Sequence, residues 1–120
     1  MRLGIDIGST TIKYVVLDEE GRCLSQDYQR HSCQINEKLF DVLQTVSERY
    51  QTETMPVVVS GSAAMGLQEK CSVPFVQEVY ATRVAAHHQL ENTDCIIELG
   101  GEDAKILFLS GGLEVRMNGT

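Results

Sequence analysis

The chain has 120 residues and a net charge of −7 at pH 7, with 42% hydrophobic and 22% charged residues. This composition is typical of a globular domain with a real core and excludes a disordered chain. The acidic balance argues against a surface that binds nucleic acid or an anionic membrane.

Cysteine spacing and the N-terminus limit the cellular setting. The four cysteines include no C-x-x-C pair, so we expect reduced thiols and neither a zinc ribbon nor a disulfide framework. No apolar leader precedes the first strand, and no run approaches the roughly 20 apolar residues of a spanning helix. We therefore expect a cytoplasmic protein.

The first half of the chain is predicted to form an antiparallel meander, a helix and a further strand. The strand segments are apolar and β-branched, and Asp18-Glu19-Glu20-Gly21 is a turn signal. The helix is indicated by apolar residues at helical spacing, namely Ile35, Leu39, Leu43, Val46 and Tyr50. The predicted elements are strands over 3–8, 11–17 and 22–28, a helix over about 35–51, and a strand over 55–60.

The second half is predicted to continue the sheet and then to begin a second meander. A helical stripe runs through Val79, Arg83, Ala86 and Leu90. The predicted elements are a loop and short helical turn over 61–67, a weak strand over 73–76, a helix over 77–90, and strands over 94–99, 104–109 and 113–117. The order βββαβαβα predicts an α/β, ribonuclease H-like lobe with a mixed sheet. We expect this lobe over 1–93 and an incomplete second lobe over 94–120.

One glycine-turn motif occurs twice in the chain. Asp6-Ile7-Gly8-Ser9-Thr10-Thr11-Ile12-Lys13 is matched 92 positions later by Glu98-Leu99-Gly100-Gly101-Glu102-Asp103-Ala104-Lys105. Each copy reads as strand, tight turn, strand, and glycine is expected there for positive φ and uncovered N–H groups. Two such hairpins facing each other would hold nucleotide phosphates, although two ordinary hairpins with a common pattern remain an alternative. Because the second copy starts close to residue 120, we expect the chain to be the front part of a longer protein.

The first copy offers groups suited to phosphate and to a metal ion. The amides of 8–11 and the hydroxyls of Ser9, Thr10 and Thr11 are predicted to bind phosphate oxygens. Asp6, at a strand end, is predicted to hold Mg²⁺ through water. Lys13 and Lys105 would bring positive charge toward phosphate, or else are outward-facing strand lysines.

The second copy contains two candidate carboxylates, whereas the histidines are poor candidates for a metal site. Asp103 and Glu102 are candidates for holding the metal or orienting an attacking water, with a solvated turn residue as the alternative for Glu102. The adjacent His87 and His88 face different directions on a helix, and His31 lies two residues from Cys33 in a loop. We expect no metal site from these residues.

Two stretches carry a family resemblance. Residues Leu3 to Lys13 resemble the first phosphate motif of the acetate and sugar kinase, heat-shock chaperone and actin superfamily. Ile97 to Lys105 together with Arg116-Met117-Asn118-Gly119-Thr120 resembles the ATPases that activate 2-hydroxyacyl-CoA dehydratases and the ATPase subunits of benzoyl-CoA reductase. The sequence of residues 98–105 is most similar to that of the long multidomain members, and the resemblance spans essentially the whole chain.

The resemblance implies an actin-like ATPase that binds ATP and Mg²⁺. The phosphates would be gripped by Gly8 to Thr11 and by Gly100 and Gly101, and Asp6 and Asp103 would be the catalytic, Mg²⁺-side carboxylates. Many short activators have Gln where this chain has Glu102, which puts a family role for that position in doubt.

The resemblance also implies a redox partner. Family members share one [4Fe–4S] cluster between two subunits, which here implies a homodimer or an intramolecular pair in the full-length protein. ATP hydrolysis would then drive a low-potential electron into an acyl-CoA dehydratase or reductase. None of the cysteines matches a ligand position, and we assign none to a cluster: Cys23, Cys33, Cys71 and Cys95.

Two other functions stay open. A sugar or small-molecule kinase would transfer the phosphoryl group to a hydroxyl, but it normally places its second phosphate motif much further downstream. A non-catalytic actin-like module would bind nucleotide for assembly. We expect the full-length protein to be an ATPase.

Overall fold

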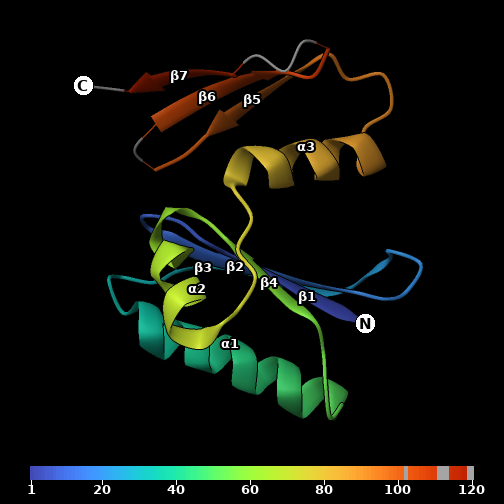
Figure 1. The fold of residues 1–120 in the computed structure, drawn as a ribbon, viewed down its shortest axis with the longest axis vertical. Coiled ribbons are helices and arrows are strands. Elements are labelled where there is room, and N and C mark those ends of the chain that lie inside the picture. Colours follow the sequence, from blue (N-terminus) through green and yellow to red (C-terminus); the bar gives the residue numbers. More distant parts are fainter. Residues whose placement is uncertain (102, 111–113, 119–120) are drawn as a thin grey trace. The chain divides into compact units, whose positions relative to one another are not determined.

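A computed structural model describes residues 1–101, 103–110 and 114–118 and divides the chain into two compact units, residues 1–76 and 77–120. Figure 1 shows the elements, which are β1 (Arg2–Ile7), β2 (Thr11–Leu17), β3 (Cys23–Arg30), α1 (Ile35–Tyr50), β4 (Val57–Ser60), the 3-10 helix η1 (Ser62–Ala64), α2 (Met65–Cys71), α3 (Glu78–Gln89), β5 (Cys95–Leu99), β6 (Asp103–Phe108) and β7 (Glu114–Asn118). In this division α3 belongs with the second sheet. The expected lobes over 1–93 and 94–120 stay a prediction.

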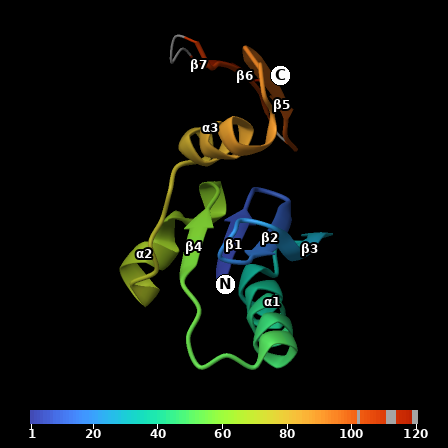
Figure 2. The same ribbon diagram turned by 90° about the vertical axis from the view of Figure 1, so that its right-hand side faces the viewer.

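The sheet of the first unit has the predicted mixed character. Its strand order is β3-β2-β1-β4, with β1 and β2 antiparallel and β1 and β4 parallel, as Figure 2 shows. The predicted strand over 73–76 is reduced to a single parallel bridge between Val59 and Phe75. Pro74 accounts for this, because it has no N–H to donate to a ladder and contributes only its carbonyl, which accepts from the N–H of Val59.

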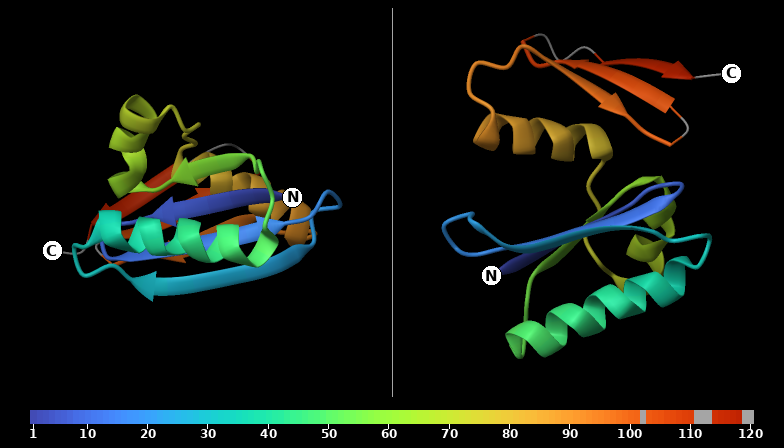
Figure 3. Two further views of the ribbon diagram at one scale, coloured as in Figure 1. Left: turned by 90° about the horizontal axis from the view of Figure 1, so that it is seen from below. Right: turned by 180° about the vertical axis from the view of Figure 1, so that it is seen from behind.

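Helix α1 packs across one face of this sheet (Figure 3) and closes the core of the first unit. Alternate residues of β1 face it, so Leu3, Ile5 and Ile7 are buried. On the helix, Val42 and Val46 are buried. The prediction placed Leu43 on this seam and was wrong, since Leu43 lies at the edge of the apolar stripe and is exposed.

The second unit is an antiparallel sheet in the order β5-β6-β7, with α3 against one face. Ala86 of α3 and Leu107 of β6 are buried on that face. Leu90, predicted to complete the helical stripe, is exposed because α3 ends at Gln89. The other face of β5 carries exposed Ile97 and Leu99.

None of the helices within residues 1–101, 103–110 and 114–118 has the length and apolarity that a membrane crossing requires.

Candidate phosphate-binding site

The first hairpin ends in a short, exposed tip. The N–H of Gly8 donates to the carbonyl of Thr11 at 2.9 Å and closes the turn between β1 and β2. Ser9 and Thr10 at the tip are exposed, and within the described part of the chain neither their N–H groups nor their hydroxyls make a hydrogen bond. Adjacent uncommitted donors on a tight turn form an anion-binding surface, because nothing in the fold competes for them.

The reason for glycine at this turn differs from the expected one. We predicted positive φ, and this was wrong: neither Gly8 nor Gly100 has a left-handed backbone. A Cβ built on Gly8 would lie 3.6 Å from Nζ of Lys13, which is an ordinary van der Waals distance. The absence of a side chain therefore keeps the surface beside the tip bare and is not needed to form the turn.

Asp6 and Lys13, both predicted site residues, are brought together next to this tip. They lie opposite each other in the β1–β2 register, on the face away from the core, with Nζ of Lys13 2.7 Å from Oδ2 of Asp6. Their side chains are 39% and 32% exposed. A pair this accessible to water contributes below about 1 kcal/mol, so a phosphate and a cation can separate the two charges at small cost.

Gly61 is a residue of this site that the sequence analysis treated only as part of a loop. It follows β4, has φ of 101°, and a Cβ there would lie 2.2 Å from the carbonyl oxygen of Ile7 and 2.7 Å from Oδ1 of Asp6. The loop after β4 therefore passes directly against the end of β1. Its sequence signal was a run of small residues after a buried strand, which marks a close backbone approach.

His31 is a second residue whose position the sequence did not reveal. Its ring is buried beside the tip, with Nε2 2.9 Å from the carbonyl oxygen of Gly8. Its Nδ1 accepts the N–H of Cys33 at 3.1 Å, and its own N–H donates to the carbonyl of Thr10 at 3.1 Å. His31 thus holds the tip from the side of β3.

The second hairpin repeats the closure of the first. The N–H of Gly100 donates to the carbonyl of Asp103 at 2.8 Å, and these two residues lie 92 positions after Gly8 and Thr11. A Cβ on Gly100 would lie 3.1 Å from Oδ1 of Asp103, so this carboxylate sits against the turn. Gly101 is exposed beside it, and Glu102 lies outside the described residues.

Lys105 is placed differently from its counterpart Lys13. It is buried, and its Nζ forms an ion pair with Glu78 of α3 and lies 3.6 Å from Oε1 of Glu98. Burial by itself lowers the pKa of Lys105, but the hydrogen bond to Glu78 and the charges of Glu98, Glu78 and Asp103 outweigh it and raise the pKa. In the structure this ammonium is committed to carboxylates, and its contact with phosphate stays a prediction, as does the pairing of the two hairpins around one nucleotide.

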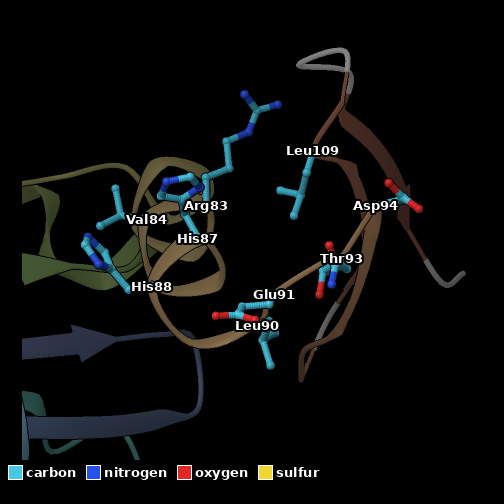
Figure 4. A pocket seen from close by; sticks show the side chains of 10 residues that line it. Arg83, Val84, His87, His88, Leu90, Glu91, Thr93, Asp94 and Leu109 are labelled. Carbon is cyan, nitrogen blue, oxygen red and sulfur yellow. The ribbon is translucent and has the colours of Figure 1, made fainter.

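Figure 4 shows a separate pocket of about 640 Å³ in the second unit. It is lined by α3 and the loop after it, where β5 begins and β6 ends. The Gly100 turn lies at the opposite end of these two strands. None of the predicted site residues lines it. Among the described residues, no group of three or more His, Cys, Asp or Glu side chains is arranged to hold a metal ion.

Comparison with known proteins identifies the family. A family model described as the BadF/BadG/BcrA/BcrD ATPase family matches residues 3–120. The chain belongs to this family. An uncharacterized protein from Methanocaldococcus jannaschii is 28% identical over 108 residues, which cover 89% of this chain and 42% of that protein.

Two solved structures have a similar fold. The activator of the 2-hydroxyisocaproyl-CoA dehydratase from Clostridium difficile, with bound ADPNP, matches with a TM-score of 0.77 at 22% identity, over 98% of this chain and 45% of that one. Component A of the (R)-2-hydroxyglutaryl-CoA dehydratase from Acidaminococcus fermentans matches with a TM-score of 0.81 at 20% identity, over 98% and 47%. These matches confirm the predicted actin-like α/β fold, and the chain spans less than half the length of these relatives.

Proposed function

We propose that this chain is the N-terminal, ATP-phosphate-binding part of an ATPase that activates a 2-hydroxyacyl-CoA dehydratase-type enzyme by ATP-driven electron transfer. The observation that carries the proposal is the exposed tip of the first hairpin, where Ser9 and Thr10 present uncommitted donors beside the exchangeable Asp6–Lys13 pair. Family membership and the fold of an activator with bound ADPNP support the choice of ATP.

The first hairpin suits the polyphosphate of MgATP. The N–H groups and hydroxyls at Ser9 and Thr10 would bind phosphate oxygens, as backbone amides in tight turns do elsewhere. Lys13 would leave Asp6 and turn toward the phosphates, which are the stronger anion. Asp6, whose carboxylate is partly exposed, would then be free to hold Mg²⁺ through its water shell.

The second hairpin would complete the site. In the proposal Gly100 and Gly101 approach the same phosphates, and the carboxylate of Asp103 orients the attacking water or a water on the metal. Bound MgATP supplies the γ-phosphorus that water attacks, and the bond from that phosphorus to the bridging oxygen of ADP breaks.

The electron-transfer part of the proposal rests on family membership alone. Within the described residues no group of three or more cysteine, histidine or carboxylate side chains is arranged to ligate a [4Fe–4S] cluster. The acyl-CoA dehydratase or reductase partner, and the pairing of two family units, belong to the full-length protein.

Hydrolysis of ATP by the full-length protein tests the proposal. Asp6→Asn is expected to lower kcat by at least about 100-fold while the fold is kept, because a metal-side carboxylate acts in the transition state. Asp41→Asn, at an exposed position on α1, is the matched control and should hydrolyse ATP as the wild type does. Equal turnover in Asp6→Asn and Asp41→Asn would remove Asp6 from the site.

Product analysis separates the proposal from the two alternatives. Release of ADP and inorganic phosphate without an acceptor, with activation of a dehydratase in the presence of a one-electron reductant, is expected. A sugar phosphate as the ³¹P NMR product would identify a kinase. Tight ATP binding without turnover would identify a non-catalytic module.

A further inference from the structure

His31 is a buried histidine next to the first hairpin, and the proposed function gives it no role. It follows β3 directly, and its exposed surface is 2%. Its main chain spans two elements, since its N–H donates to Thr10 at the tip and its carbonyl accepts from the N–H of Gln34 at 2.8 Å, at the start of α1. The residues after it, Ser32 and Cys33, both have positive φ.

Both nitrogens of the His31 ring are committed, and their partners fix its proton. The carbonyl oxygen of Gly8 can only accept, so Nε2, at 2.9 Å, must carry the proton and donate. The N–H of Cys33 can only donate, so Nδ1, at 3.1 Å, must be the unprotonated acceptor. Only the neutral ring with its proton on Nε2 satisfies both contacts.

These contacts determine where the tip amides point. In a trans peptide unit the C=O and the N–H that follows it are directed oppositely within one plane. The ring of His31 holds the carbonyl of Gly8, and so orients the N–H of Ser9 away from His31. The main-chain N–H of His31 holds the carbonyl of Thr10 and orients the N–H of Thr11 in the same manner.

We propose that His31 is a positioning residue that preorganises the amides of the first hairpin for the terminal phosphates of a nucleoside triphosphate. The inference rests on the proposed function, because that function assigns phosphate to the N–H of Ser9, the amide that the ring of His31 orients through Gly8. Donors that are already oriented do not have to be ordered when the anion binds, and this strengthens binding. His31 does not touch the nucleotide in this account and acts through Gly8.

Two matched substitutions test the inference. In His31→Gln the side-chain amide nitrogen reaches about as far as Nε2 and can still donate to Gly8, whereas in His31→Asn the shorter amide reaches the position of Nδ1 and cannot. Calorimetric titration with MgATP is expected to give a Kd within about threefold of wild type for His31→Gln and at least tenfold weaker for His31→Asn. Both should lower the melting temperature to a similar extent.

The outcomes separate the inference from the function on which it rests. Absence of MgATP binding in the full-length wild-type protein contradicts the proposed function. Wild-type binding together with equal affinities of His31→Gln and His31→Asn, whether both unchanged or both weakened, overturns the role of His31 alone.

A measurement on the unmodified protein covers the case in which the variants do not fold. Long-range ¹H–¹⁵N spectra of the imidazole rings are expected to show His31 as the Nε2–H tautomer with a slowly exchanging proton. The exposed His87 and His88 serve as internal references for fast exchange. An Nδ1–H tautomer, or exchange of His31 as fast as that of His87 and His88, would overturn the inference.

Discussion

The two copies of the glycine-turn meander bury opposite faces. Ile5 of the first copy is 3% exposed under α1, whereas its counterpart 92 positions later, Ile97, is 67% exposed. The charged face shows the reverse, since the side chain of Lys13 is 32% exposed and that of Lys105 only 5%. The register of the first two strands and the hydrogen bond that closes the turn are the same in both copies, so the helix that packs on each sheet decides which face becomes core.

The two equivalent lysines have different surroundings. In the first copy the Asp6–Lys13 pair is accessible to water and can exchange its partners for a phosphate and a cation. In the second copy α3 adds Glu78, and Lys105 joins α3 to the sheet. A sequence motif that repeats with the same spacing can therefore leave its lysine accessible to water in one copy and bury it in an ion pair with a helix in the other.

The largest expected effect comes from truncating the equivalent apolar residues. Ile5→Ala should lower the free energy of unfolding by about 3 kcal/mol, because it leaves a cavity under α1. Ile97→Ala should cost below about 1 kcal/mol, because the side chain is already in water. Urea unfolding of both variants measures the difference, and similar losses would contradict the opposite burial of the two copies.

Removing the lysine charges should give the next largest difference. Lys105→Met is expected to lower the free energy of unfolding by about 2 kcal/mol, less than for a fully buried pair because Glu78 and Glu98 keep some contact with water. Lys13→Met should cost below about 1 kcal/mol.

The pH dependence of the Lys105 contribution has a definite sign. Since the pKa of Lys105 is raised on folding, its stabilisation is fully present below the pKa of an unfolded lysine. It is lost as the pH rises through the folded pKa. The stability gap between wild type and Lys105→Met should therefore close only at strongly alkaline pH, and a gap that closes near neutral pH would refute the ion pair.

Alanine at the two turn glycines should give a smaller contrast. A Cβ on Gly100 meets Asp103 at 3.1 and 3.3 Å, so Gly100→Ala is expected to cost about 1 kcal/mol. A Cβ on Gly8 meets its neighbours at 3.6 Å or more, so Gly8→Ala should cost below about 0.5 kcal/mol. Thermal melts compare the two; the reverse order would show that Gly8 is required by the fold and not by a bound ligand.

The smallest effect on stability is expected from a substitution in the turn that follows β2. Asp18 accepts hydrogen bonds from the backbone N–H groups of Glu20 and Arg22 and from Nε of Arg22, and the N–H of Arg22 is the main cause of its lowered pKa. The second copy has Ser110 at the equivalent position. The stabilisation from Asp18 is present above the unfolded pKa and lost as the pH falls through the folded one. Asp18→Asn should thus begin to lose its destabilising effect as the pH falls below about 4, and a difference from wild type that stays constant as the pH is lowered from 7 into the acid range would contradict the contact.

Local patterns predicted the strands, the turns and the repeat because each is encoded by neighbours in sequence. The alternation in β1 and β2 and the spacing in α1 placed these elements within two residues of their observed ends. Pro74 shows the limit of such patterns: a short apolar run predicted a strand, and the missing N–H reduced it to one bridge.

The candidate site was only partly predictable, because part of it depends on contacts between distant segments. The motif indicated Asp6, Lys13 and the tip residues directly. Gly61 and His31 lie 55 and 25 positions after Asp6, and only the packing of β4 and the path after β3 bring them to the turn. The burial of Lys105 could not be predicted from the sequence either, because it depends on where α3 packs.

The most direct test of the central claim is a titration of the ¹⁵N-labelled full-length protein with MgATP, followed through the backbone amides of the first hairpin. The account predicts that the amide protons of Ser9 and Thr10 move the most, in the direction of stronger hydrogen bonding, and that both follow one binding curve. Saturation with ATP while these two amides stay unchanged, or no change in any amide, would contradict the assignment of the first hairpin as the phosphate site.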